Sequence, residues 1–368
     1  MTAASLLTLE GCRWLYRAMM MARVSFLSVM GMRHRRVVAT VALVSSAVIT
    51  AGHGQPPAEP APFAEAAPPS ESKKETPENP SAAVSAAGAA HLAAIVSEPW
   101  AKTWQKATLH GVKLVEAKAK PAFDTGLPAV GHARIAGPDG KSGYLMWDTG
   151  ESGKLVEFAL DDVLKPDSAN ARAITGVPAL QQFAMEREDG SLIASGCVPT
   201  SAASLLGFWI ATAHPTWTGS VGGDPAGLTK RLRARLSMEA YPDVDGFTEN
   251  GMALAGAQPP ALAKVIQADA ADHQIPVTSR FGRFAFQELK TEIDAGRPVL
   301  LTCLVRVPHK PHLSWGHEVA GVGWAKLNGE NYAGVLDNFF PVTHPETIRW
   351  IRSDAFSGLI TVKPNSNK

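Results

Sequence analysis

The sequence has few of the residues that build a disulfide framework or a nucleic-acid surface. Only three of its 368 residues are cysteines, too few for the bridges that hold small secreted folds together. Charge of neither sign is in excess, because 35 basic side chains are balanced by 34 acidic ones and the formal net charge is +1. This balance does not favour a nucleic-acid partner. At 45% hydrophobic residues, the composition is that of a globular protein with one large or two small domains.

The N-terminal apolar run is short for a membrane span. Residues 37–51 are 15 uncharged residues, whereas a transmembrane helix needs ~20. The run follows a basic cluster at residues 32–36 and leads into small residues, as the core of a secretory signal peptide does. We therefore predict a signal or anchor segment within residues 1–54, and a secreted or periplasmic protein. Membrane tethering through an uncleaved run is the alternative.

Large apolar side chains are scarce over residues 55–97, where Pro, Ala, Ser and Glu dominate. Such a composition cannot bury enough apolar surface to offset chain entropy, so we expect a disordered linker. Residues 98–176 then alternate apolar and polar positions between Gly-rich turns such as GPDGKS (137–142). They are predicted to form a small β-rich accessory or pro-region. As a pro-region it would be dispensable, and residues 177–368 would fold without it.

Residues 177–368 contain helical patterns first and strands later. Apolar runs at residues 299–305, 318–324 and 332–338 predict three strands, and helices alternate with loops before them. This segregation indicates an α+β fold.

The segment SGCVPTSAASLLGFW (195–209) places Cys197 at a predicted helix start. Pro199 is tolerated only in a first helical turn, which sets the start beside the cysteine. A thiol there lies against unpaired backbone N–H groups and the positive end of the helix dipole, and both favour the nucleophilic thiolate. A buried structural cysteine is the alternative. One helix face is apolar or small: Ala202, Leu205, Leu206, Trp209, Ile210 and Ala213.

A base and an orienting group follow downstream. His317 precedes the strand-like run EVAGVGW, and an imidazole can take the thiol proton near neutral pH. The next strand ends in Asp337 and Asn338, either of which can orient the imidazole. Adjacent strand residues point to opposite faces, so only one of the two can serve. The order of Cys, His and Asp or Asn at element boundaries predicts a catalytic triad.

Two further predictions concern the second cysteine of this region and the possibility of a metal site. Cys303 lies within an apolar strand-like run and is expected in the core. His309, His312 and His317 fall within nine residues without completing a recognised zinc spacing. No metal and no cofactor is therefore predicted.

Four of these segments resemble those of papain-like cysteine peptidases, in the branch related to the bacteriocin-processing (double-glycine leader) peptidases. GCVPTSAASLLGFW is similar to the nucleophile segment of that branch, and LKTEIDAGRPVLL to the stretch leading into its sheet. GHEVAGVGW and VLDNF are similar to its histidine and aspartate strands. The resemblance covers roughly residues 177–356. It implies a papain-like fold, with the nucleophile helix packed on an antiparallel sheet.

The resemblance also implies roles for individual residues. Cys197 would be the nucleophile, His317 the base and Asp337 the third member, although papain itself uses asparagine, which keeps Asn338 open. The implied activity is hydrolysis of amide bonds in a peptide or protein substrate. A papain-fold cell-wall amidase, an acyl transferase and a non-catalytic binding module of that fold are the alternatives.

The sequence departs from the family pattern in two places near the nucleophile. Val198 stands where the family often has a second glycine after the cysteine. The family's oxyanion-hole glutamine lies a few residues before the cysteine, whereas Gln181 and Gln182 lie 16 and 15 residues upstream of Cys197. The resemblance favours Gln182, with the segment MEREDGSLIAS as an inserted loop.

We predict that Cys197→Ala removes amide hydrolysis, because no other group would attack the carbonyl. Cys303→Ala should cost only ~1–2 kcal/mol of unfolding free energy, as other core truncations of this size do. Turnover measured beside chemical denaturation separates the two variants. Equal loss of turnover in both, with folding retained, would contradict the assignment of the nucleophile.

Overall fold

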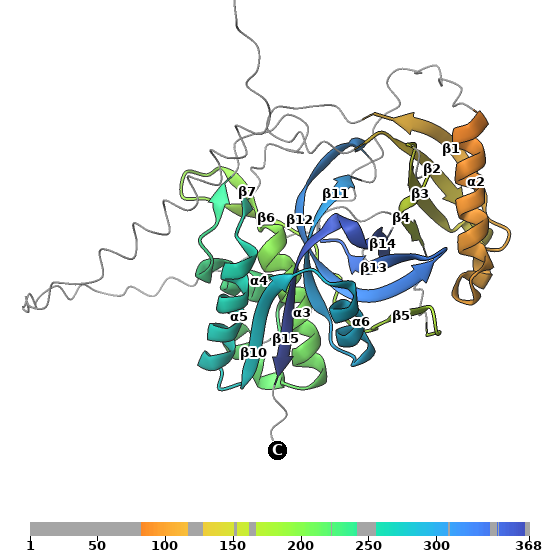
Figure 1. The fold of residues 1–368 in the computed structure, drawn as a ribbon. Coiled ribbons are helices and arrows are strands. Elements are labelled where there is room, and N and C mark those ends of the chain that lie inside the picture. Colours follow the sequence, from red (N-terminus) through yellow and green to blue (C-terminus); the bar gives the residue numbers. More distant parts are fainter. Residues whose placement is uncertain are drawn as a thin grey trace, which may run out of the picture. The chain divides into compact units, whose positions relative to one another are not determined.

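An antiparallel sheet runs through the described part of the chain (Figure 1). In this computed structural model the sheet has 11 strands, in the order β1-β2-β3-β4-β14-β13-β12-β11-β15-β10, with β5 paired to β12. Each of these pairings is antiparallel. Its strands are β1 (Thr108–Val115), β2 (Val130–Ala136), β3 (Ser142–Asp148), β4 (Leu155–Leu160), β5 (Ala171–Ala173), β10 (Val277–Arg283), β11 (Val299–Val307), β12 (Lys310–Leu327), β13 (Glu330–Leu336), β14 (Arg349–Arg352) and β15 (Phe356–Pro364).

The structure describes most of the chain from residue 82 onward. The predicted signal or anchor segment of residues 1–54, and the linker up to residue 81, lie outside the described residues. None of the helices formed by the described residues is long and apolar enough to span a membrane. The described ranges are residues 82–116, 128–150, 153–161, 167–221, 223–240, 255–307, 310–338, 344 and 346–364.

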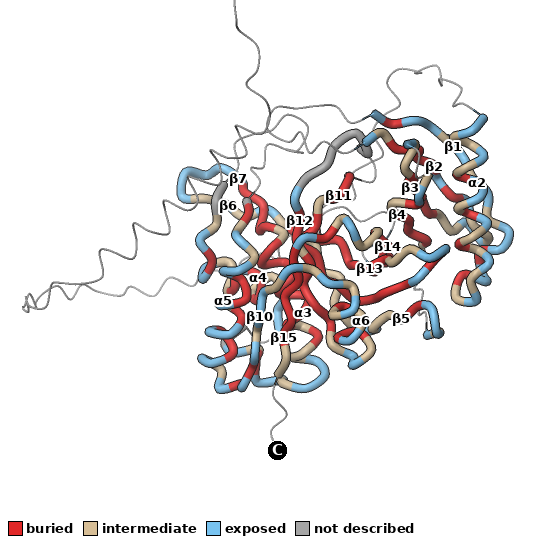
Figure 2. Tube along the Cα trace, in the orientation of Figure 1, coloured by how far each residue is buried: buried red, intermediate tan, exposed pale blue. Residues whose placement is uncertain are grey.

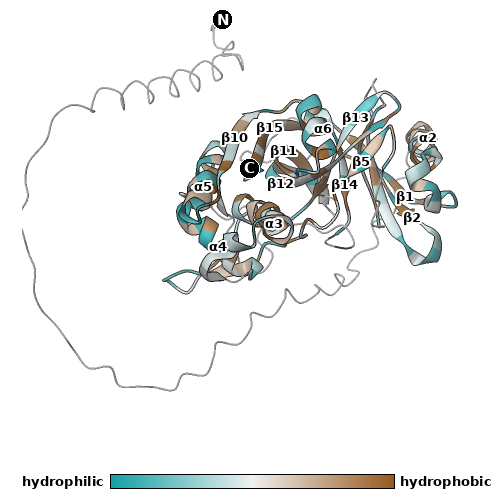
Figure 3. Cartoon of the chain, turned by 90° about the horizontal axis from the view of Figure 1, so that it is seen from below, coloured by the Kyte–Doolittle hydropathy of each residue, from teal (hydrophilic) through white to brown (hydrophobic). Residues whose placement is uncertain are grey.

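Helices cover both faces of the sheet at β11 and β15. Figure 3 shows these strands between α6 (Phe286–Asp294) and α3 (Cys197–Thr212), with hydrophobic colour along the strands. Successive side chains of a strand point to opposite faces of the sheet, so neighbouring residues pack against different helices. Leu300 of β11 packs in the cluster of α3, α4 (Pro225–Arg235) and α5 (Pro259–Asp272), whereas its neighbour Leu301 packs with α6. The predicted α+β class is confirmed, with helices packed on a large antiparallel sheet.

The predicted disordered linker is wrong over its last residues, because Ala82–Ser97 form helix α2. The segment is rich in alanine, the best helix former. Leu92 and Ile95 are buried against the sheet, and Gly88 lets the ring of Trp147 approach to within 2.8 Å of where a Cβ would stand. The composition of the whole linker conceals these few apolar residues.

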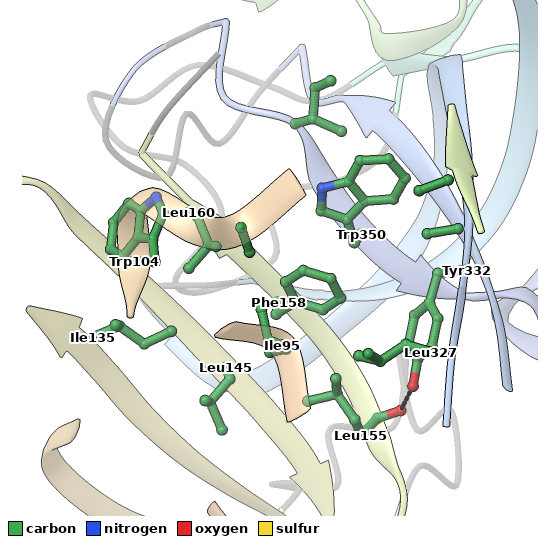
Figure 4. Packing of buried hydrophobic residues seen from close by; sticks show 14 of the residues in the cluster. Ile95, Trp104, Ile135, Leu145, Leu155, Phe158, Leu160, Leu327, Tyr332 and Trp350 are labelled. Carbon is green, nitrogen blue, oxygen red and sulfur yellow. Dashed lines mark hydrogen bonds between the residues drawn. The ribbon is translucent and has the colours of Figure 1, made fainter. Parts of the chain in front are cut away.

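The β-rich segment of residues 98–176 shares its core with the C-terminal part of the chain (Figure 4). The ring of Phe158 on β4 stacks on that of Trp350 on β14, with centroids 6.3 Å apart. The hydroxyl of Tyr332 on β13 donates to the carbonyl of Leu155, at 2.9 Å. Strands β4 and β14 also pair directly. The boundary at residue 176 therefore runs through one sheet and one hydrophobic cluster.

The three predicted strands are confirmed as β11, β12 and β13, and the predicted helix after Cys197 as α3. The turn at residues 137–142 does join β2 to β3, as a hairpin. Strands β10, β14 and β15 were not predicted. Polar residues interrupt VTSRFGR, the sequence of β10, which forms because it pairs with β15 along its whole length. Figure 2 shows burial concentrated on α3 and the central strands.

The shared core changes the expectation for truncation. A chain starting at Val177 should fail to fold, because β14 loses β4, one of its two partner strands, and Trp350 loses its contact with Phe158. A chain starting at Ala82 should fold, because it keeps all the described elements. Within the full chain, Phe158→Ala should lower the free energy of unfolding by ~3–5 kcal/mol. Circular dichroism and thermal melting measure all three, and a cooperative melt of the Val177 chain would restore the pro-region reading.

Candidate active site

Cys197 is the first residue of α3, and the backbone before it explains why. Gly196 has φ 97°, a left-handed conformation that suits glycine and turns the chain into the helix. The backbone N–H of Thr200 and its hydroxyl both donate to the Gly196 carbonyl, at 3.2 and 2.7 Å. These bonds close the first turn while the Cys197 thiol stays only partly buried. The thiol therefore lies at the positive end of the helix, where a thiolate is stabilised.

His317 lies on β12 and is buried between Cys197 and Asp337. Its Nε2 is 3.1 Å from Oδ1 of Asp337. A hydrogen bond to the Cys197 thiol also acts on the imidazole. Because Nε2 is taken by the carboxylate, Nδ1 is the nitrogen that remains for the thiol. The three predicted triad residues thus form one hydrogen-bonded row, with the imidazole in the middle.

The environment of His317 favours the imidazolium form. Burial by itself would lower the pKa of His317, but attraction to the Asp337 carboxylate and hydrogen bonds to Asp337 and Cys197 outweigh it and raise this pKa to about 10. The imidazole therefore keeps its proton at neutral pH and loses it as the pH rises towards about 10. A proton held on His317 is available to a leaving group, and its charge favours a thiolate on Cys197.

Cys303 has a different environment, as predicted. It is buried in strand β11 directly opposite His317, and its Sγ contacts the His317 carbonyl at 3.5 Å. Burial is the main reason why the pKa of the Cys303 thiol is raised well above its usual value. Cys303 therefore remains a protonated core thiol.

Asp337 and Asn338 follow β13 and contact different partners. Asp337 reaches His317, whereas the Asn338 side-chain amide donates to the carbonyls of Cys197 and Glu318, at 3.1 and 2.9 Å. It also donates to the hydroxyl of Ser201. The geometry thus places Asp337, and not Asn338, on the imidazole. Asn338 instead ties the first turn of α3 to the histidine strand.

Gln182 reaches this network despite its distance along the chain. Its Nε2 donates to Oδ1 of Asn338 at 2.8 Å, and its backbone N–H donates to the Asn338 carbonyl at 2.7 Å. The intervening residues form a hairpin of β6 (Ala184–Glu186) and β7 (Leu192–Ala194). Its two ends are joined by hydrogen bonds between Phe183 and Ser195. The predicted insertion is therefore closed at its base, and Gln182 lies next to the residues preceding Cys197.

The side chain of Gln181 is directed elsewhere. Its Nε2 donates to the backbone carbonyl of Asp337 at 2.9 Å. Both glutamines therefore fasten the chain after β13, but only Gln182 contacts the Asn338 side chain that touches the Cys197 carbonyl.

Arg349 is a site residue that the sequence did not single out. It is fully buried on β14 and donates through Nη1 to Oδ2 of Asp337, the carboxylate oxygen that His317 does not use. Its Nη2 and Nε donate to Oε1 of Glu157, at 2.7 and 2.9 Å. One signal was available in the sequence, namely an arginine beside the apolar pair Trp350 and Ile351. Nothing in the sequence connects that arginine to Asp337 or Glu157.

No arrangement of three or more His, Cys, Asp or Glu side chains that could hold a metal ion occurs among the described residues. Of the three clustered histidines, His317 is hydrogen-bonded to Asp337. His309 and the side chain of His312 lie outside the described part of the structure.

The two neighbours after β13 should respond differently to substitution. Asp337→Asn removes the charge that raises the pKa of His317, so the imidazolium is lost at lower pH and the alkaline limb of the activity profile shifts down. The maximal rate should fall at least about tenfold, a barrier increase of about 1.36 kcal/mol.

Asn338→Ala removes hydrogen bonds at the start of α3. It should cost ~1–3 kcal/mol of stability, with a smaller loss of rate and no shift of the limb. Rates from pH 6 to 10.5 and chemical denaturation test both, and the reverse ranking would assign the orienting role to Asn338.

Comparison with known proteins identifies no family for this chain. A scan against protein-family models gives no match, and a search of curated proteins gives no significant match.

Proposed function

We propose that this chain is an exported, thiol-dependent peptidase of papain-like fold. It hydrolyses peptide amide bonds through Cys197, His317 and Asp337. The observation that carries the proposal is the buried imidazole of His317, hydrogen-bonded to a partly exposed thiol at a helix N-terminus and to a buried carboxylate. A structural cysteine would not need a charged histidine beside it. Export rests on the apolar run of residues 37–51 and its basic flank.

The papain-like architecture is supported by the order and placement of the triad. Cys197 opens α3, which packs beside the sheet, while His317 lies on β12 and Asp337 directly follows β13. Strands β12 and β13 are antiparallel neighbours. The order Cys, His, Asp and the helix-to-sheet placement are those that the resemblance implies.

The reaction begins with the Cys197 thiolate and the protonated His317. The sulfur attacks the amide carbonyl carbon, and the carbonyl oxygen takes the negative charge. The Cys197 backbone N–H and the Gln182 amide are the donors proposed to stabilise that oxyanion. His317 then gives its proton to the amide nitrogen, the C–N bond breaks, and the amine leaves. The acyl group remains on sulfur as a thioester.

Water completes the cycle. His317, now neutral, takes a proton from the water that attacks the thioester carbonyl. The C–S bond breaks, the carboxylic acid is released, and the thiolate–imidazolium pair is restored. Asp337 holds the imidazole ring in place and stabilises its positive charge whenever it is protonated. No cofactor is required, and the substrate is a peptide or protein.

Digestion of casein by the wild type and by Cys197→Ala tests the proposal. The wild type should release peptides, the variant none, and iodoacetamide at neutral pH should label Cys197 in preference to Cys303, because only Cys197 is partly exposed. Release of peptidoglycan fragments without casein cleavage would assign the triad to a cell-wall amidase instead. No hydrolysis of either, with Cys197 reacting no faster than a free thiol, would make the domain a binding module.

A further inference from the structure

The carboxylate of Asp337 is held on both sides. One oxygen faces His317, while the other accepts a hydrogen bond from Nη1 of Arg349. Arg349 is 0% exposed, and Asp337 is 4% exposed. A guanidinium with no contact to water must have its charge and its donors satisfied by protein groups. Asp337 supplies only part of this, because it is also bound to the imidazole.

Glu157 supplies the remainder. It lies on β4, is 2% exposed, and accepts from Nε and Nη2 of Arg349 through Oε1. The hydroxyl of Tyr144 on β3 donates to the same oxygen. Nη2 of Arg349 also donates to the carbonyl of Arg306, at 3.2 Å. In addition to its contact with Asp337, the guanidinium is thus held in place by groups from β3, β4 and β11.

Strand register explains how these side chains meet. Tyr144 of β3 pairs with Ala159 of β4, which pairs with Arg349 of β14, which pairs with Val335 of β13. The four therefore lie on one rung and one face of the sheet. Glu157 lies two residues before Ala159, and Asp337 two residues after Val335. Both carboxylates are consequently diagonal neighbours of the guanidinium, one on each side of it.

Glu157, Arg349, Asp337 and His317 form a row in which negative and positive groups alternate. This alternation affects the pKa of the His317 imidazole. A cation beside Asp337 weakens the attraction between its carboxylate and the imidazolium of His317. An anion on the far side of that cation restores part of the attraction. Burial raises the pKa of Glu157, while Arg349 and Tyr144 act against that rise. The two hydrogen bonds from the Arg349 guanidinium favour the charged form of the Glu157 carboxyl.

We propose that Arg349 is a positioning residue for Asp337, and that the negative charge of Glu157 offsets part of the effect of the Arg349 charge on His317. The β-rich segment of residues 98–176, which contains Glu157, is then part of the active site. This inference rests on the proposed function for its effect on rate, but its effect on the histidine does not. The alternative is an ion pair that only stabilises the sheet. Such a pair would change the melting temperature and leave the proton affinity of the imidazole as it is.

Four other charged or titratable groups lie near His317, and none of them acts on it through Arg349. Cys197 of α3 and Asp337 contact the imidazole directly. Cys303 faces it from β11 but stays protonated. Glu318, next along β12, is buried, and burial raises its pKa to about 7. These four groups are unchanged in the variants below, so a shift in those variants reports on the row through Arg349.

The test follows the titration of His317 by NMR in full-length protein with labelled histidines, assigned by the signal missing from His317→Ala. Glu157→Gln keeps the shape of the side chain and removes its charge. The His317 titration midpoint should move to lower pH by about one unit, because a nearby anion in a protein interior has been lost. A midpoint within 0.2 units of the wild type, in a folded variant, would overturn the inference.

Glu292→Gln is the matched control. Glu292 is also a buried carboxylate with two basic partners, Arg297 at 2.6 Å and Lys363 at 2.7 Å. It lies on α6 and outside the row. This variant should lose stability without moving the His317 midpoint, and a shift equal to that of Glu157→Gln would overturn the assignment to the row.

Tyr144→Phe serves if Glu157→Gln does not fold. It removes a hydrogen-bond donor from the Glu157 carboxylate and leaves its negative charge less neutralised, so the midpoint should shift to higher pH, by less than one unit. An unchanged midpoint would then count against the inference.

Arg349→Lys separates position from charge. Lysine keeps the positive charge but lacks the planar fork that holds two carboxylates at once. The maximal rate of amide hydrolysis should fall at least about fivefold, while the His317 midpoint moves less than in Glu157→Gln. An unchanged rate would overturn the positioning role. If the midpoint shifts as expected but the wild type hydrolyses no amide, the row stands and the proposed function fails.

Discussion

The rest of the site depends on the contacts of one buried carboxylate, that of Asp337. It shares its two oxygens between His317 and Arg349. An isolated carboxylate would be costly in such a place, and so would an isolated guanidinium. Each offsets the cost of burying the other, and the Asp337 carboxylate raises the pKa of the His317 imidazole. The chemistry assigned to Cys197 depends on that pKa, because a charged histidine stabilises the thiolate.

The same interaction joins parts of the chain that the sequence presents as separate. Glu157 completes the hydrogen bonding of Arg349 from β4, and Phe158, next to it, stacks on Trp350, next to Arg349. On one face of the strands the contact is polar and serves the site. On the other face it is apolar and forms the core. Adjacent residues of two paired strands therefore combine both tasks, which is why we expect the C-terminal part of the chain to need the β-rich segment for folding.

Asn338 organises the other side of the site. Its amide holds the carbonyls of Cys197 and Glu318 and the side chain of Gln182. Cys197, the histidine strand and Gln182 are thereby joined through one side chain. Two adjacent residues after β13 thus have complementary tasks. Asp337 controls charge and Asn338 controls spacing, because neighbours in an extended chain point in opposite directions.

From the sequence alone, the α+β class, the helix starting at Cys197, the strand carrying His317, the strand that Asp337 follows, and the core position of Cys303 were all predictable. Each depends on local chemistry, such as a proline in a first turn or an apolar run. Tertiary structure decided the choice between Asp337 and Asn338, the closure of the hairpin before Cys197, and the contact of Arg349 with Glu157. It also decided the helix of residues 82–97. The physical reason is strand register. The residues of a strand do not by themselves determine which strand it pairs with or in which register. A shift of one residue in the pairing of β4 with β14 would turn Glu157 away from Arg349.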